Sequence, residues 1–293
     1  MPEALRVLVV GDVIDDVIVV PHGPIRSDTD TVSDIRFSAG GSAGNTASWL
    51  GHTGTPATFV GMVGHADVAR HSAEFEQYGV EPRLQSHPSL PTGAIIVLVD
   101  GERRSMLTER GANDSIDLSA IEVEGYAALH LTGYSLFKIM DESAVVALIA
   151  RARAAGLEVC VDPGSAGFLL DYGVERFLTA VAGATILVPN LEEGQVLTGL
   201  TDPAEVTAAL TARFPLVALT LDRSGSLVQR AGSSAVAVPA VETTIVDPTG
   251  AGDAFTAGFL GELLASGDEV AAASAGARLA SLAVSSLGAR PSR

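Results

Sequence analysis

The sequence predicts an α/β protein in which helices flank both faces of a doubly wound, mostly parallel sheet. Short apolar runs alternate with stretches of helical periodicity from Leu129 to Ser285. Strands separated by helices of this length imply right-handed crossovers, which pack the helices against a parallel sheet. Polar residues directly follow several of the apolar runs, at Asp12, Asp162, Asn190, Asp222 and Asp247. We therefore expect a ligand site beyond the carboxyl ends of the strands.

The amino-terminal part predicts two strands and two helices. Leu5–Val10 is an apolar run typical of a strand buried on both faces. The glycine-rich stretch Ser38–Ala47 leads into a predicted helix through Trp49. Thr58–Val63 predicts a second strand, and Asp67–Tyr78 predicts a second helix.

A β-hairpin then interrupts the alternation. Ala94–Val99 and Ser105–Thr108 flank Asp100-Gly101-Glu102, which is a turn signal between two strand-like runs. Such a hairpin is expected to leave the main sheet, where it could cover a site.

The carboxyl-terminal part alternates regularly. Extended segments are predicted at Leu129–Leu131, Glu158–Val161, Ile186–Val188, Val217–Leu221, Ser234–Val238 and Thr243–Val246. Helices are predicted at Glu142–Ala155, Val174–Val181, Pro203–Arg213, Phe255–Leu264 and Glu269–Ser285. Because no repeat or linker divides the sequence, we expect a single domain of residues 1–293.

Composition narrows the class of partner. With 47% hydrophobic and 18% charged residues the chain is typical of a globular protein. Its net charge of −17 argues against nucleic acid or an anionic membrane as the main partner. The one cysteine, Cys160, lies in an apolar run and predicts a core thiol. Because Met1–Leu5 lacks the start of a secretory signal and no apolar run is long enough to span a bilayer, we expect a cytoplasmic protein.

The stretch Val246–Phe255 carries the strongest chemical signal. It leaves extended chain, turns on glycines and enters a helix, whose first backbone N–H groups lack partners and attract anions. Gly250, Ala251 and Gly252 leave these donors accessible to a phosphoryl group, and Asp253 could accept a proton from a substrate hydroxyl. A plain glycine-rich connection, with Asp253 favouring the helix dipole, is the alternative.

Polar residues near the amino terminus predict binding of substrate hydroxyls. Asp15 and Asp16 interrupt an apolar stretch, and since adjacent strand residues point to opposite faces, only one of them is expected to reach a ligand. Gly40 and Gly41 allow close backbone approach, and Asn45 offers a polar side chain at a helix start. Solvated strand residues and a helix-capping turn are the alternatives.

Four motifs together resemble the ribokinase-like (PfkB) family of carbohydrate and nucleoside kinases. Gly40-Gly41 followed by Asn45 is similar to its sugar-binding signature, and Asn190-Leu191-Glu192-Glu193 matches its N-x-x-E motif. Thr220–Gly225 resembles T-x-G-x-x-G, with Asp222 in place of the first glycine. Asp247–Asp253 matches D-T-x-G-A-G-D, with Pro248 in a variable place. The resemblance runs from about Val7 to Gly288.

The resemblance implies a role for each matching residue. Asp253 would be the base and the backbone of Gly250, Ala251 and Gly252 the anion hole. The other implied sites are Asp16, Gly40, Gly41 and Asn45 for the substrate; Thr220, Asp222 and Gly225, with Asn190, for ATP; Asn190 and Glu193 for magnesium, through water; and Asp247, Thr249 and Gly288 for potassium. For Asn190 and Glu193 a helix-capping box is the alternative.

The resemblance also implies the activity. We expect transfer of the γ-phosphoryl group of ATP to a hydroxymethyl group of a sugar or sugar-like molecule, beneath a small β-sheet lid at about 13–37 and 92–108. Arg104 and Arg110 in the lid would favour an open or acidic sugar, unless they are simply solvated. The alternatives are a nucleoside kinase, a non-catalytic sugar-binding regulator and an NAD-dependent dehydrogenase, which lacks its glycine fingerprint here. Exposed lid strands would allow a homodimer.

Overall fold

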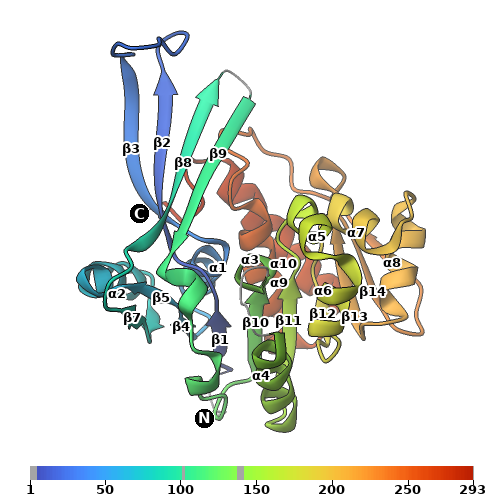
Figure 1. Cartoon of the computed structure of the whole chain (residues 1–293). Helices are drawn as coiled ribbons and strands as arrows, with labels where there is room; N and C mark the ends of the chain where they lie inside the picture. The colour runs from blue at the N-terminus through green and yellow to red at the C-terminus, as the bar shows by residue number, and fades with distance from the viewer. Residues whose placement is uncertain (1–4, 101–102, 137–141, 293) are drawn as a thin grey trace.

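The computed structural model of the chain describes residues 5–100, 103–136 and 142–292. Within these residues a large sheet forms the centre of the molecule (Figure 1). Across it the strands follow the order β15 (Val236–Val238), β14 (Ser226–Arg230), β13 (Leu216–Thr220), β12 (Ile186–Leu187), β11 (Glu158–Asp162), β10 (Ala128–Thr132), β1 (Val7–Val10), β4 (Ala57–Val60) and β6 (Val80–Pro82). Neighbouring strands from β6 to β13 pair in parallel, whereas β14 is antiparallel to β13 and β15 is antiparallel to β14. The predicted mostly parallel sheet is confirmed.

Helices cover both faces of this sheet (Figure 1). One face carries α1 (Ser42–His52), α2 (Val68–Glu76), α9 (Ala251–Ser266) and α10 (Glu269–Val284); the other carries α4 (Glu142–Ala154), α5 (Ala166–Tyr172), α6 (Val174–Ala180), α7 (Leu191–Thr198) and α8 (Pro203–Thr211). The short helix α3 (Gly133–Leu136) follows β10. Alternate residues of β1 enter the two cores, Val7 and Val9 on one side and Leu8 and Val10 on the other. This two-sided burial explains why β1 is an uninterrupted apolar run.

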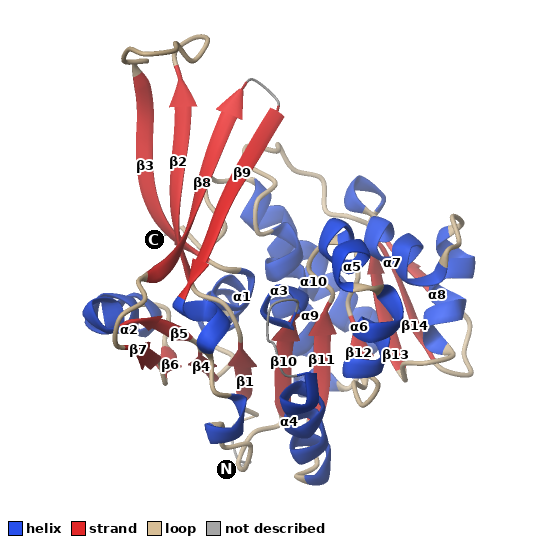
Figure 2. Cartoon of the chain, viewed as in Figure 1, coloured by secondary structure: helices blue, strands red, loops and turns tan. Residues whose placement is uncertain are grey.

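A second sheet stands away from the first, at the upper left of Figure 2. Its order is β3 (Ser33–Gly40), β2 (Ile14–Pro21), β8 (Thr92–Asp100) and β9 (Arg103–Gly111). We call this sheet the lid. It confirms the expected excursion, although its strands run on to Gly40 and Gly111, past the expected segments. The predicted turn at Gly101-Glu102 lies outside the described residues.

Two extended segments differ from the sequence prediction. Thr58–Val63 is not one strand: the chain breaks at Gly61, where a side chain would come within 2.7 Å of the Gly11 carbonyl oxygen. Beyond the break, β5 (Met62–Gly64) pairs with β7 (Gln85–His87) in a separate small sheet. Thr243–Val246 joins no strand either, because the amide of Val246 donates to the Val284 oxygen at the end of α10.

No helix among the described residues is both long enough and apolar enough to cross a membrane.

Candidate active site

A cavity of about 500 Å³ lies where the base of the lid meets the carboxyl ends of the central strands. The residues that line it include Asp12, Asp16, Gly41, Ser42, Asn45, Asp162, Asn190, Glu193, Thr220, Thr249, Gly250, Ala251, Gly252 and Asp253. Most of the residues predicted for substrate, phosphate and nucleotide therefore meet in one place. The predicted residues outside its lining are Gly40, Asp222, Gly225, Asp247 and Gly288.

The amino terminus of α9 opens into this cavity. Gly250, before the first turn, has a φ of 77°, and a side chain there would come within 2.6 Å of the Ala289 oxygen. No side chain caps this helix start, and nothing lies within 4 Å of the point that a Gly252 side chain would occupy. The Ala251 amide makes a long hydrogen bond of 3.4 Å to the Pro248 oxygen, and the next amides of this sixteen-residue helix are left accessible to an anion.

Asp253 stands in the first turn of α9 with both carboxylate oxygens engaged. Oδ1 accepts a hydrogen bond of 2.7 Å from the Ser42 hydroxyl, and Oδ2 accepts one of 2.8 Å from the Asn45 amide nitrogen. Burial raises the pKa of Asp253 to about 6, although these two hydrogen bonds oppose the shift. A carboxylate with this pKa is suited to accept a proton near neutral pH.

The substrate end of the cavity depends on close packing at two glycines. A side chain at Gly40 would overlap the Asp16 carboxylate, and one at Gly41 would come within 2.6 Å of the Asp12 carbonyl oxygen. Burial raises the pKa of Asp16 to about 7, with further contributions from nearby carboxylates. Asp12 accepts the amide of Ala43 at 3.1 Å and so fixes the start of α1.

The adjacent acids Asp15 and Asp16 do face opposite sides of β2. Asp16 lines the cavity, whereas Asp15 is held on the outer side by Arg70 of α2 through hydrogen bonds of 2.6 and 2.7 Å. This division follows from the two-residue period of a strand. Asp15 is accordingly a link between the lid and the body, and of the two acids Asp16 is the one that lines the active-site cavity.

Asn190 and Glu193 form a capping box at the start of α7. The Asn190 side chain accepts the amide of Glu193 at 2.9 Å, and Glu193 Oε2 accepts the amide of Asn190 at 2.9 Å. The capping alternative is therefore observed, and both residues still line the cavity. Burial, together with mutual repulsion between Asp162 and Glu193, raises the pKa of the Asp162 carboxyl, and burial raises that of Glu193 to about 7.

The Thr220–Gly225 motif reaches the cavity only through Thr220. Asp222 is exposed and adopts a φ of 49°, in the left-handed region where glycine is the usual residue. This backbone favours glycine, and aspartate is among the residues that tolerate it best. Gly225, with a φ of 92°, forms the next bend of the same loop.

Asp247, Thr249 and Gly288 meet although they are far apart in the sequence. Asp247 Oδ1 accepts the amide of Thr249 at 2.9 Å, and Oδ2 accepts the amide of Gly288 at 3.1 Å. The buried Asp247 carboxylate thus joins the turn before α9 to the segment after α10.

The lid supplies an apolar wall and one buried arginine. Ile95, Val97 and Met106 line the cavity, as does Arg110, whose Nε donates to Asp114 at 2.8 Å. Arg110 is therefore a buried, paired residue rather than a solvated one. The side chain of Arg104 lies outside the described residues.

Sequence reasoning missed several residues at the site, three of which stand out. Tyr134 and Phe168 line the cavity from α3 and α5, and Arg290 contacts Asn45 from the segment after α10. None belongs to a short motif, so only the folded chain brings them to the site. Among the described residues no group of three or more histidine, cysteine, aspartate or glutamate side chains forms a ready metal site.

Comparison with known proteins gives a consistent result. The model of the pfkB family carbohydrate kinases matches residues 4–293. The bifunctional protein HldE of Azotobacter vinelandii is 33% identical over 94% of the chain, and the match spans 58% of that longer protein. Among solved structures, adenosine kinase from Sinorhizobium meliloti has a TM-score of 0.86 at 25% identity, covering 98% of this chain and 96% of its own. A probable sugar kinase from Rhizobium etli CFN 42 has a TM-score of 0.86 at 23% identity, with coverages of 98% and 95%.

Proposed function

Since the chain belongs to the pfkB family of carbohydrate kinases, which are phosphotransferases that use ATP, we propose that it transfers the γ-phosphoryl group of ATP to a hydroxymethyl group of a sugar or sugar-like small molecule. The observation that carries this proposal is the placement of Asp253 in the first turn of an uncapped helix, beside an open glycine turn. A carboxylate with a pKa of about 6 and a cradle for an anion share one helix end.

The proposed reaction requires little covalent chemistry from the protein. The acceptor hydroxyl replaces the Ser42 hydroxyl at Asp253 Oδ1, while the Asn45 amide stays on Oδ2, and it passes its proton to that carboxylate. The acceptor oxygen then forms a bond to the γ-phosphorus, the bond to the β-phosphate oxygen breaks, and ADP leaves. The amides of Ala251 and Gly252 stabilise the charge on the transferring group.

The acidic residues at the phosphate end fit a divalent cation. Burial raises the pKa of both Asp162 and Glu193, and a cation beside them would oppose that rise by stabilising the charged carboxylates. Bound magnesium would neutralise phosphate charge, and because it keeps several waters, one or two oxygen ligands suffice. We propose that Glu193 and Asn190 hold it through water.

We propose a potassium site beside the turn at Asp247. The Asp247 carboxylate supplies the negative charge for a weakly held cation, because a carboxylate oxygen that already accepts one amide, as each does from Thr249 or Gly288, can accept a further contact. A cation at this place would support the turn that orients the first amides of α9. Omission of potassium is expected to lower turnover more than sugar affinity.

A nucleoside is the second candidate substrate. The apolar lid wall of Ile95, Val97 and Met106 would suit a base, and the adenosine kinase and the sugar kinase named above superpose on this chain with equal TM-scores. The acids Asp12 and Asp16 at the other end suit ribose or sugar hydroxyls alike. The fold therefore favours neither class, and we propose a sugar because the family model and Arg110 point to a polar acceptor.

An ADP-release assay tests the activity. The chain is supplied with ATP and magnesium, with and without potassium, and with pentoses, hexoses, keto-deoxy acids, polyols and nucleosides in turn. Asp253→Asn is expected to lower turnover by about 10²–10⁴-fold while sugar affinity in calorimetry changes little, because only the base is lost.

Asp171→Asn, an exposed change in α5, is the matched control and is expected to retain turnover. Sugar binding without ADP release in the unchanged chain would support a non-catalytic regulator instead. Equal turnover in the Asp253 and Asp171 variants would remove Asp253 as the base.

A further inference from the structure

Arg290 is a buried arginine that no sequence motif assigns to the site. It lies in the segment after α10 and is 7% exposed. Its Nη2 donates to the Gly40 carbonyl oxygen at 3.0 Å, and its Nε donates to Asn45 Oδ1 at 3.4 Å. It thus contacts two residues of the proposed sugar-binding signature.

Asn45 is the link between Arg290 and the base. Its amide nitrogen donates to Asp253 Oδ2 at 2.8 Å, while its oxygen accepts from Arg290. The two ends of an asparagine amide have nearly the same shape, so its orientation depends on its partners. Because arginine can only donate, it fixes the Asn45 oxygen on its own side and directs the nitrogen to Asp253.

The neighbouring helix has no side chain where the guanidinium lies. A side chain at Gly44 of α1 would come within 2.8 Å of Arg290 Nη2. On another side, the guanidinium stacks over the ring of Phe75 at 4.9 Å from its centroid. The position of Arg290 is therefore set by contacts with α1 and α2 as well as by its hydrogen bonds.

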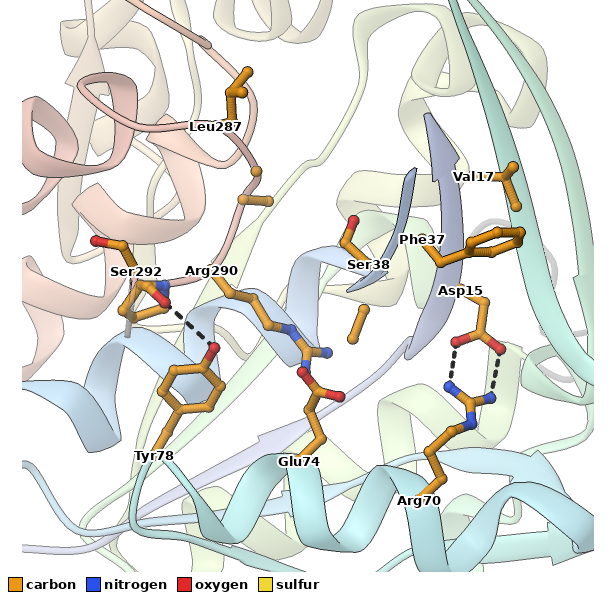
Figure 3. A pocket seen from close by; sticks show the side chains of 14 residues that line it. Asp15, Val17, Phe37, Ser38, Arg70, Glu74, Tyr78, Leu287, Arg290 and Ser292 are labelled. Carbon is orange, nitrogen blue, oxygen red and sulfur yellow. Dashed lines mark hydrogen bonds and ion pairs between the residues drawn. The ribbon is translucent and has the colours of Figure 1, made fainter. Parts of the chain in front are cut away.

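Stability alone does not account for an arginine at this position. Nη1 is buried and has no hydrogen-bond partner among the described residues, which is a cost that an apolar side chain would avoid. An outer cavity of about 760 Å³ lies beyond Arg290. Glu74 lines this cavity and points toward the guanidinium (Figure 3). Arg290 thus forms part of the wall of this outer cavity and contacts Asn45 of the active site.

Charge also favours a role at the base. Asp16 and Asp253 each lie near Asp12 and near Arg290. Arg290 lowers the pKa of both Asp16 and Asp253, against the effect of burial. Removal of this cation would leave Asp16 and Asp253 without the buried positive charge that lowers their pKa values. Arg70 is already paired with Asp15 on the outer side.

We propose that Arg290 is a positioning residue for phosphoryl transfer, which orients the Asn45 amide toward the base Asp253 and holds the Gly40 carbonyl of the sugar-binding turn. The inference rests on the proposed kinase function. Arg290 acts through Asn45 and Gly40 and touches neither ATP nor the acceptor hydroxyl.

The test compares Arg290→Met and Arg290→Lys with Arg278→Met, an exposed arginine change in α10. Arg290→Met is expected to lower kcat/KM for the sugar by about 10²-fold, because small displacements of reacting groups are costly, while KM for ATP changes little. Arg290→Lys keeps the charge without the planar fork and is expected to recover only part of the loss. Arg278→Met is expected to match the unchanged chain.

Two further measurements separate positioning from simple loss of packing. Gly44→Ala places a methyl group against Arg290 Nη2 and displaces the guanidinium without removing its charge. This variant is expected to lower kcat/KM for the sugar by less than Arg290→Met does. In Arg290→Ala, added methylguanidinium can enter from the outer cavity and is expected to restore turnover, with thermal melting recorded throughout to exclude unfolding.

The outcomes are distinct. Kinase activity that is equal in the unchanged chain and in a folded Arg290→Met variant overturns the role of Arg290 and leaves the kinase intact. A fall in kcat/KM for the sugar that is matched by an equal rise in KM for ATP, and that methylguanidinium does not restore, also overturns it. An unchanged chain that turns over no sugar or nucleoside removes the proposed function and this inference together.

Discussion

The Asp253 carboxylate is under opposing influences that predict a pH dependence. Burial raises its pKa to about 6, while hydrogen bonds from Ser42 and Asn45 stabilise its charged form. Because a base must be unprotonated, kcat/KM for the acceptor is expected to be constant above about pH 7 and to fall about tenfold per pH unit well below pH 6.

The measurement is kcat/KM from pH 5 to 8 with magnesium held saturating, with the folded state checked at each pH. The residual activity of Asp253→Asn should lack this acidic limb. A profile that is flat across the range would show that no group with this pKa acts as the base.

Single residues of the site were predictable to the extent that they belong to short motifs. Asn45 and Asp253 could be predicted because local backbone patterns mark them, whereas strand alternation showed only that one of Asp15 and Asp16 reaches a ligand, and the family resemblance selected Asp16. Arg290 could not, because it is 245 positions from its partner Asn45 and follows an ordinary helix. The separation of Asp222 from the cavity was also unpredictable, since it depends on a left-handed bend that the motif alone does not orient.

At the scale of elements, the central strand β10 contains a buried histidine that predicts a loss of stability in acid. His130 is fully buried, and burial lowers its pKa to about 4. Its unfolded-state pKa is about 6.5, so protons bind the unfolded chain preferentially. This contribution to stability is complete above about pH 6.5 and is expected to be lost as the pH falls toward 4, by about 3 kcal/mol in total.

Urea unfolding between pH 7 and pH 4 measures this dependence. His130→Leu is expected to lose stability less steeply on acidification than the unchanged chain, and exposed His65→Leu is the matched control. Parallel stability curves for all three proteins would contradict the assignment to His130.

Elements were predictable where burial is two-sided and less so elsewhere. The run at β1 and those at β10 and β11 were identified because parallel strands between helix layers are largely apolar. β14 was missed because its sequence, Ser226–Arg230, is mostly polar and its partner strands are antiparallel. Thr243–Val246 was predicted as extended from its β-branched residues, yet the end of α10 provides the partner for its amide.

At the scale of the whole molecule, the segment after α10, residues 285–292, packs against the substrate end of the cavity. The Trp49 indole donates to the Ala289 oxygen at 2.9 Å, and the Tyr78 hydroxyl donates to the Pro291 oxygen at 3.3 Å. The same segment supplies Gly288 to Asp247 and Arg290 to Asn45. The last part of the chain thereby joins the turn before α9 to the turn at the base of the lid.

The outer face of the lid predicts self-association. Phe37 and Ile96 both neighbour Val17 across the strands, and Leu107 neighbours Ile96, so one apolar row crosses the sheet. Phe37 is 80% exposed and Leu107 57%, which is unusual for a face that stays in water. We propose that two lids pack through this row in a homodimer.

Sedimentation analysis over a range of protein concentrations tests the dimer. Phe37→Asp is expected to shift the population to monomer, because a carboxylate in an apolar interface is not solvated. Leu282→Asp, at a 52% exposed apolar residue of α10, is the matched control and is expected to leave the dimer intact. A chain that is monomeric at every concentration would refute the proposal, as would equal dissociation of the two variants.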